Sequence, residues 1–308
     1  MTNSTITVDV VFNLFSFIIE TISFFVCLIL LSAIIYRIIE IKYKHGQLRI
    51  DIPLILTINI ICSILIKSTL QIIHITIPTL IKDYQIMTYF QETSFSRFRA
   101  YILWSVVGVL YWSYTLLAFF RFTRVIYSTK RWLHRSSLYV YVLIPCQYIF
   151  VFISLLPSLV IFNNIDLIPN EAYCTIVFSQ FYFALYESSI TFSIPFSIVG
   201  IFYTFIVRKM RETSAIRQGQ ELDRRDYIVI RRMGLNMMLL SMMALPFMII
   251  YIKDIIQNHY ESILYRVQWL SSSVGSGLFS ITLPFITTRL RDILKPNGIA
   301  PINNQHMT

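Results

Sequence analysis

Charged residues are scarce in this chain. Only 14% of its 308 residues are Asp, Glu, Lys or Arg, whereas 56% are hydrophobic. Soluble domains carry about 25% charged residues, so this composition leaves no room for a soluble domain of ordinary size. Gly/Ser-rich linkers, internal repeats and low-complexity runs are also missing from the sequence. We therefore predict a single membrane domain over residues 1–308.

Patterns typical of enzymes and metal sites are missing as well. The five histidines are scattered along the chain. They form no His-Glu-x-x-His pair and no Cys/His ligand spacing, and no paired aspartates lie within apolar segments. A catalytic site needs several converging polar groups, and the sequence does not show them. The expected protein is not an enzyme and needs no cofactor or metal.

Seven long apolar stretches make up most of the chain. Each exceeds the ~20 apolar residues that an α-helix needs to cross ~30 Å of hydrocarbon. They predict an all-α membrane protein in which residues 11–288 form seven helices, between a tail at 1–10 and a tail at 289–308. The stretches cover roughly residues 11–39, 52–81, 98–120, 137–162, 175–207, 228–252 and 262–288.

Lysine and arginine are concentrated in every second gap between these stretches. One set of gaps, with the carboxyl-terminal tail, holds 20 of them, and the opposite side holds five. The positive-inside rule makes the 20-residue side cytoplasmic, so a multi-pass membrane protein with its amino terminus outside and its carboxyl terminus cytoplasmic is expected. The net charge of +10 then indicates membrane lipid rather than nucleic acid as the partner. The Asn3 sequon predicts glycosylation and agrees with this orientation.

Polar segments extend the predicted helices on the cytoplasmic side. Residues 208–232 mix basic and acidic side chains without proline. The fifth and sixth helices are therefore expected to continue past the membrane and to turn near Gly219. Residues Thr288–Leu294 have apolar side chains at helical spacing and precede Pro296. They predict a short amphipathic eighth helix on the membrane surface.

An arginine and three prolines occur in order along the chain, one in each of four predicted helices. Arg121 directly follows the third stretch, Pro195 lies in the fifth with Tyr203 two turns further on, and Pro246 and Pro284 lie in the sixth and seventh. Each proline alone is weak evidence, because proline is common in membrane helices. Together they resemble the rhodopsin-like G-protein-coupled receptors, in a divergent form, over nearly the whole chain. The resemblance implies a receptor that binds an extracellular ligand and activates a heterotrimeric G protein.

The resemblance also implies roles for single residues. Arg121 would be held by an acid at rest and would meet the G protein when the sixth helix swings outward, while Tyr203 would move toward it. Phe120 replaces the usual neighbouring acid, so we expect Asp226 to hold Arg121 from the sixth helix. The alternative is that Asp226 pairs in water with the adjacent Arg225.

Other positions depart from the family's pattern. Ala244 replaces the tryptophan two residues before Pro246, the expected hinge of the sixth helix. Leu283 and Thr287 flank Pro284 where asparagine and tyrosine are expected. The family outline is preserved, while these parts of its switch are missing.

The resemblance also limits the ligand. Leu103 stands where receptors for biogenic amines carry an aspartate, and Gly277 stands where opsins carry the retinal lysine. A ligand other than retinal, and other than a biogenic amine held by that aspartate, is therefore expected. The family's extracellular disulfide would join Cys174 to a cysteine near Ser96, and none is there, which leaves Cys174 unpaired.

Ligand contacts are expected in the outer half of the bundle. Glu187 lies eight residues before Pro195 and is expected to face the family's ligand cavity, since ionisable residues within spans are costly and mark functional sites. Tyr101, Trp104 and Trp269 are expected as walls of this cavity. The alternative for these aromatic residues is ordinary core packing.

Two further ionisable residues lie within apolar stretches. Glu20 belongs to the first stretch and Lys67 to the second, at similar predicted depths. They are expected either to pair with each other inside the bundle or to act as separate functional groups.

Two other classes of protein share long apolar helices. A transporter tends to show repeated halves and paired broken helices, whereas these seven stretches are unlike one another. A seven-helix chemosensory receptor of another family would share the topology, with the proline matches accidental. G-protein activation that is lost in Arg121→Ala would favour the rhodopsin-like receptor, and flux through proteoliposomes would favour a transporter or channel.

Overall fold

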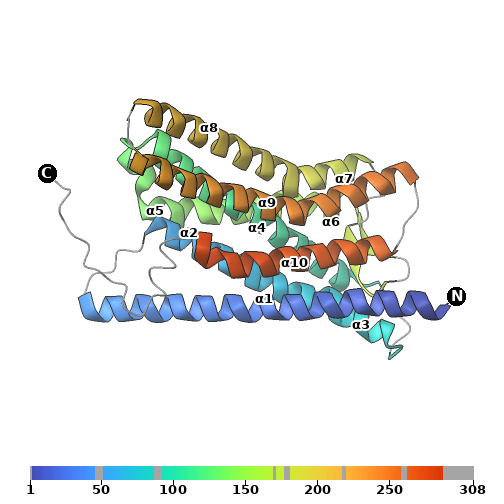
Figure 1. The fold of residues 1–308 in the computed structure, drawn as a ribbon. Helices are drawn as coiled ribbons and strands as arrows, with labels where there is room; N and C mark the ends of the chain where they lie inside the picture. Colours follow the sequence, from blue (N-terminus) through green and yellow to red (C-terminus); the bar gives the residue numbers. More distant parts are fainter. Residues whose placement is uncertain are drawn as a thin grey trace.

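The described part of the chain folds into seven helical rods that run side by side (Figure 1). A computed structural model describes residues 2–45, 51–86, 92–168, 171–176, 181–216, 220–257 and 262–286. Four rods are single helices: α1 (Thr2–His45), α4 (Ser94–Ile126), α9 (Gln220–Gln257) and α10 (Ser262–Ile286). The other three rods each join two α-helices through a π-helical turn. They are α2 (Ile52–Gln71) with η1 (Ile72–Thr76) and α3 (Ile77–Asp83), α5 (Ser136–Leu138) with η3 (Tyr139–Leu143) and α6 (Ile144–Val160), and α7 (Phe181–Ser188) with η4 (Ser189–Ser193) and α8 (Ile194–Ile216).

This arrangement confirms the predicted all-α seven-helix class and corrects one boundary. The predicted start of the fifth helix at residue 175 is wrong, because Thr175 lies in a strand and α7 begins at Phe181. The extended fifth and sixth helices are confirmed, since α8 reaches Ile216 and α9 begins at Gln220. Helix α1 already begins at Thr2, within the predicted tail. The predicted eighth helix lies outside the described residues.

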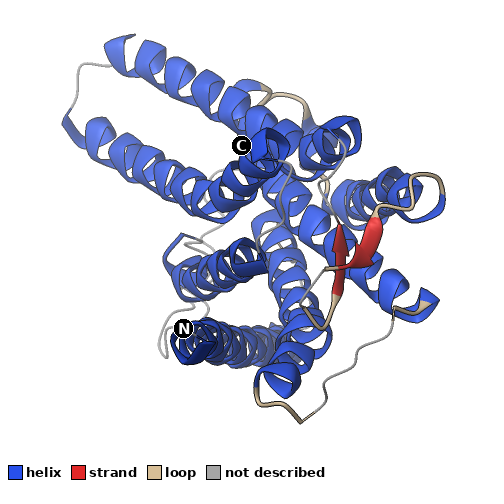
Figure 2. Cartoon of the chain, turned by 90° about the vertical axis from the view of Figure 1, so that its right-hand side faces the viewer, coloured by secondary structure: helices blue, strands red, loops and turns tan. Residues whose placement is uncertain are grey.

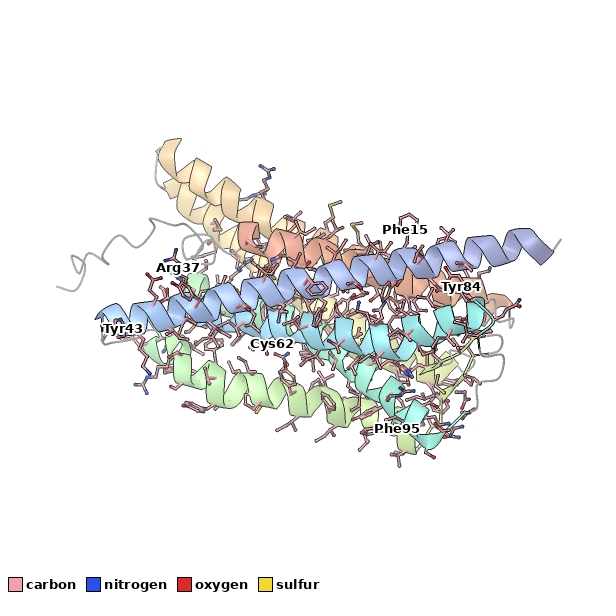
Figure 3. All side chains as sticks on the ribbon, turned by 90° about the horizontal axis from the view of Figure 1, so that it is seen from below. Phe15, Arg37, Tyr43, Cys62, Tyr84 and Phe95 are labelled. Carbon is pink, nitrogen blue, oxygen red and sulfur yellow. The ribbon has the colours of Figure 1, made fainter. Side chains whose placement is uncertain are left out.

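Long apolar helices dominate the described residues. Five of them are long and apolar enough to cross a membrane: Val10–Glu40, Ile52–Asp83, Ser94–Ile126, Ser136–Val160 and Leu185–Glu212. In α9 the apolar part is shorter, at Gly234–Ile249, and α10 contains six serines that lower its hydropathy. Figure 3 shows α1 along the outside of the bundle, where the ring of Phe15 is 56% exposed, as expected for a lipid-facing side chain.

The three π-helical turns occur at the same distance from a proline. Turns η1, η3 and η4 each begin six residues before Pro78, Pro145 or Pro195. Proline lacks a backbone N–H group and its ring clashes with the carbonyl four residues earlier, and a wider turn relieves this clash. At η4 the indole of Trp112 donates to the Ile190 carbonyl at 3.1 Å. A side chain of α4 thereby satisfies a carbonyl near the helix irregularity.

Helix α4 lies at the centre and contacts α2, α6 and α8. Its Ser113 Oγ accepts from Asn59 Nδ2 at 2.9 Å and from Gln147 Nε2 at 2.7 Å. The Tyr148 hydroxyl donates to Asn59 Oδ1 at 3.2 Å. These bonds satisfy polar groups buried among apolar side chains and fix how α2 and α6 meet α4.

A short antiparallel hairpin joins the fourth rod to the fifth. Strand β1 (Ile165–Leu167) pairs with β2 (Cys174–Ile176), with Asp166 opposite Thr175. It lies across one end of the bundle, which we call the hairpin end (Figure 2). Helix α4 begins at this end and reaches Arg121 near the opposite end, which we call the arginine end.

Candidate functional site

Arg121 and Tyr203 meet at the arginine end. Nη1 of Arg121 in α4 donates to Oη of Tyr203 in α8 at 3.4 Å. The preceding residue, Phe120, packs edge-on against Tyr139 with ring centroids 5.6 Å apart. Asp226 belongs to α9, but its side chain lies outside the described residues. The structure thus brings together two of the predicted switch residues, and the expected Arg121–Asp226 pair stays a prediction.

The two other predicted switch residues, Pro246 and Pro284, lie inside α9 and α10. The helices approach closely beside Pro246. A Cβ atom built on Gly275 of α10 would lie 2.0 Å from Cγ of Met243 in α9. Any larger side chain at residue 275 would have to displace the Met243 side chain or the helix that carries it, so glycine permits this close approach next to the predicted hinge.

Four aromatic rings from four rods pack together below the hairpin. We call Trp104, Phe192, Phe247 and Trp269 the aromatic cluster, and each is at most 3% exposed. The Trp104 centroid lies 5.5 Å from that of Phe247, 5.8 Å from that of Trp269 and 6.2 Å from that of Phe192, all edge-on. Edge-to-face packing of this kind stabilises by about 0.5–1.5 kcal/mol per pair beyond the buried area. The cluster fills the centre of the bundle near the hairpin end.

The hairpin closes this end of the bundle. Residues 171–176 are all buried, and Trp104 Nε1 donates to Thr175 Oγ1 at 2.9 Å. Arg266 at the start of α10 binds Glu171 through Nε at 2.7 Å and Asp83 at the end of α3 through Nη1 at 3.0 Å. Burial raises the pKa of Glu171, and the Arg266 guanidinium opposes this effect. One guanidinium therefore ties the hairpin loop to two rods.

Cys174 in β2 lies beside Ser96 in the first turn of α4. The distance from Cys174 Sγ to Ser96 Oγ is 3.1 Å, and Cys174 is a free cysteine. Its carbonyl also contacts Nε2 of the buried His74 at 3.0 Å. Polar contacts from α4 and η1 thus hold β2 at the place where the family's pattern has a disulfide, and the expectation that Cys174 forms no disulfide is confirmed.

Glu20 and Lys67 form an ion pair deep in the bundle, which is the first of the two alternatives that the sequence left open. Lys67 Nζ lies 2.5 Å from Glu20 Oε1, and both side chains are 0% exposed. The same ammonium donates to Ser276 Oγ at 2.8 Å and to the Ser272 carbonyl at 3.3 Å. One charged group therefore connects α1, α2 and α10.

The four predicted ligand contacts divide into two groups. Trp104 and Trp269 belong to the aromatic cluster, whereas Tyr101 faces α6, where its hydroxyl donates to the Phe152 carbonyl at 2.8 Å. Glu187 is also on the α6 side, next to Ser158. The structure therefore keeps Tyr101 and Glu187 apart from the two tryptophans.

A comparison with family models decides the class of this seven-helix bundle. The model described as "7 transmembrane receptor (rhodopsin family)" matches residues 55–276, most of the chain. The chain belongs to the rhodopsin family of receptors. No curated protein matches it. Receptors of this family are G-protein-coupled signalling proteins, and the multi-pass membrane location of this one follows from its family and its apolar helices.

Several residues of this receptor's site were not predicted from its sequence. Phe247 is indistinguishable in the sequence from the other apolar residues of its span, and Phe192 was noted only as part of the segment that ends at Pro195. In the sequence Arg266 contributed only to the count of basic residues near the ends of the spans. Its ion pairs with Asp83 and Glu171 could have been predicted, because these acids lie in gaps on the same side of the membrane. Asn3 lies in the first turn of α1, and its side chain is outside the described residues.

Proposed function

We propose that this receptor binds an extracellular ligand at the hairpin end and activates a heterotrimeric G protein at the arginine end. The positive-inside rule supports the orientation, because the basic side of the sequence carries Arg121. The receptor would then lie in the plasma membrane as one domain, with residues 11–288 spanning it. Its amino terminus and a glycosylated Asn3 would be outside, and its carboxyl terminus would be cytoplasmic.

The contact between Arg121 and Tyr203 carries this proposal. The guanidinium is bound to a tyrosine of α8, and the neighbouring residue in α4 is Phe120 rather than an acid. In the family's switch the tyrosine approaches the arginine when the G-protein site is open. We therefore expect an appreciable active population without added ligand, which a ligand shifts only if it binds one state more tightly.

Replacing Arg121 with alanine should abolish G-protein activation. The expected result is a basal signal in cells carrying a panel of G-protein dissociation reporters, and its fall to the level of untransfected cells in Arg121→Ala. Lys209→Ala is the matched control, because Lys209 is an exposed cation of α8 paired with Glu212 at 3.2 Å. Surface labelling would confirm equal expression. Equal reporter signals from Arg121→Ala and the unmodified receptor would refute the coupling role.

Replacing Asp226 with alanine should raise basal activation. If Asp226 holds Arg121 in the resting state, its removal leaves the contact with Tyr203 as the favoured one, and the population shifts toward the active state. The same reporters measure this, with Asp223→Ala as the control on the same helix. An unchanged basal signal would mean that Asp226 pairs elsewhere.

The aromatic cluster is the proposed ligand site. Trp104 and Trp269 lie below the hairpin and are linked to it through Thr175, so a ligand that reaches them moves β2. A Cβ on Gly277 would lie 3.0 Å from Ile19 of α1. This position therefore faces α1 and has no amine that would bind retinal. Leu103 supplies no carboxylate for a biogenic amine.

A further inference from the structure

A cluster of buried polar groups lies away from the aromatic cluster. Glu187 is 2% exposed, and within the described residues its carboxylate oxygens have no hydrogen-bond partner other than the neighbouring Ser158 hydroxyl. The hydroxyls of Ser105, Ser158 and Thr191 are at most 1% exposed, and the side-chain partners of the two serines are Tyr101 for Ser105 and Glu187 for Ser158. Nearly all buried polar groups in proteins are paired, and an unpaired one costs about 1–3 kcal/mol, more when it is charged. These four residues, the side cluster, form a site with unused hydrogen-bonding capacity.

The side cluster begins where three helices touch. A Cβ atom on Gly108 of α4 would lie 3.7 Å from Cδ1 of Leu155 in α6 and 4.0 Å from Cγ2 of Thr191 in η4. This contact shows that Gly108, Leu155 and Thr191 lie at the same height along the bundle and on the sides of α4, α6 and η4 that face one another. Thr191 is therefore the innermost member of the side cluster.

The other three members lie one turn nearer the hairpin end. Ser105 precedes Gly108 by three residues, and Glu187 precedes Thr191 by four, on rods that both run away from the hairpin. Ser158 lies three residues beyond Leu155 on α6, which runs toward the hairpin. Residues three or four apart share a helix face. Ser105, Ser158 and Glu187 are therefore placed at one level, and the Ser158 hydroxyl is next to the Glu187 carboxylate.

The chemistry of the side cluster fits a protonated amine. An ionised carboxylate only accepts hydrogen bonds, and each hydroxyl has lone pairs that accept as well. An ammonium group has three donors and a compensating charge. Aromatic rings line the same end of these rods: Phe162 stacks on Phe183 at 4.1 Å and meets Tyr186 edge-on at 6.0 Å. Ring faces attract cations, which adds to the preference for an ammonium.

The position of Glu187 favours an amine with an apolar tail. Glu187 lies six residues into α7, about 9 Å along the helix at 1.5 Å per residue. This depth suits the polar head of a molecule that is dissolved in the bilayer. Apolar side chains on the outer faces of α6 and α7 are exposed where lipid would lie, among them Ile153 at 63%, Val160 at 69% and Leu185 at 44%. A hydrocarbon tail would pack against them.

We propose that the side cluster binds the ammonium head of an amphiphilic amine that enters from the bilayer between α6 and α7. The carboxylate of Glu187 supplies the charge, and Ser105 and Ser158 accept the other hydrogen bonds. This rests on the proposed function and adds a second ligand position to it, because Glu187 is one of the predicted ligand contacts that lies apart from the aromatic cluster. Binding itself does not depend on G-protein coupling.

Binding of n-octylamine to the purified full-length receptor in phosphatidylcholine nanodiscs tests this proposal. Octylamine should raise the temperature of half-unfolding by several degrees with a saturable dose dependence, because a ligand that binds only the folded state stabilises it. Uncharged 1-octanol should not. Glu187→Gln should remove the response to octylamine, whereas Glu92→Gln, which alters an exposed carboxylate at the same end, should keep it.

A second variant covers the case in which Glu187→Gln folds poorly. Ser105→Ala/Ser158→Ala removes two acceptors without changing the charge. Because hydrogen bonds to charged groups contribute about 1.5–3 kcal/mol, it should weaken octylamine binding at least about tenfold. An equal response to octanol, or an undiminished octylamine response in Glu187→Gln or the double variant, would overturn the proposal. If octylamine binding fails while Arg121-dependent activation persists, only the side cluster is refuted.

Discussion

Replacing Lys67 with alanine should lower the free energy of unfolding by about 3–5 kcal/mol. The substitution leaves Glu20 charged or forces it to take up a proton in a site with 0% exposure. It also removes the donor to Ser276 and to the Ser272 carbonyl, so α1, α2 and α10 lose their shared contact. A thermal unfolding curve of the purified receptor in detergent measures the loss.

Two controls separate the buried charge from lost packing. Lys209→Ala breaks the ion pair between Lys209 and Glu212, whose side chains are 52% and 65% exposed, respectively. It should lower the free energy of unfolding by less than about 1 kcal/mol. Glu20→Leu/Lys67→Met replaces both charges with apolar groups and should recover most of the stability, because no unpaired charge remains. A double variant as unstable as Lys67→Ala would show that the pair contributes through its shape and not through its charges.

Replacing Ser96 with cysteine should create a disulfide with Cys174. Ser96 Oγ and Cys174 Sγ are already 3.1 Å apart, and an S–S bond of about 2.05 Å needs a movement of only about 1 Å. Disulfides stabilise proteins by about 2–4 kcal/mol. The Ser96 hydroxyl also caps α4, since it accepts from the Thr93 N–H at 3.1 Å, and its loss offsets part of the gain by about 0.5–2 kcal/mol. The net expectation is a higher unfolding temperature that reductant abolishes.

The control for this disulfide is Ser94→Cys, which places a thiol in the same turn of α4 on an exposed residue. It should give no reductant-sensitive stabilisation. Mass spectrometry of the digested Ser96→Cys protein should recover one cross-linked peptide that joins residues 96 and 174. Two free thiols under oxidising conditions would contradict the geometry of the hairpin and α4.

Features set by composition and by order along the chain could be predicted. The seven rods follow from apolar stretches long enough to span a bilayer, and the family follows from Arg121 with its ordered prolines. The Glu20–Lys67 pair was accessible because charges within apolar helices must find partners. The β hairpin was not predicted, because its three-residue strands are too short to show alternation, and Thr175 instead read as the start of a helix.

Side-chain direction was the part that the sequence did not determine. Tyr101 and Trp104 are three residues apart on α4, yet one reaches Phe152 on α6 and the other reaches Trp269 on α10. Which of these neighbours forms a ligand site depends on the rotation of each helix about its own axis. The pattern of hydropathy does not determine this rotation when apolar side chains occupy nearly every face of the helix.

The π-helical turn η4 alters how residues of the fifth rod should be compared with those of other receptors. Glu187 is eight residues before Pro195, and η4 (Ser189–Ser193) lies between them. A wider turn absorbs about one additional residue, which corresponds to about 100° of rotation in a helix with 3.6 residues per turn. Counting back from the proline as though the helix were regular therefore misplaces Glu187 by about 100° about the helix axis, whereas the structure has it beside Ser158 of α6. An alignment with other receptors should allow one inserted residue at each of η1, η3 and η4. Residues before each turn would then be matched with residues that lie on the same face of the helix in the other receptors.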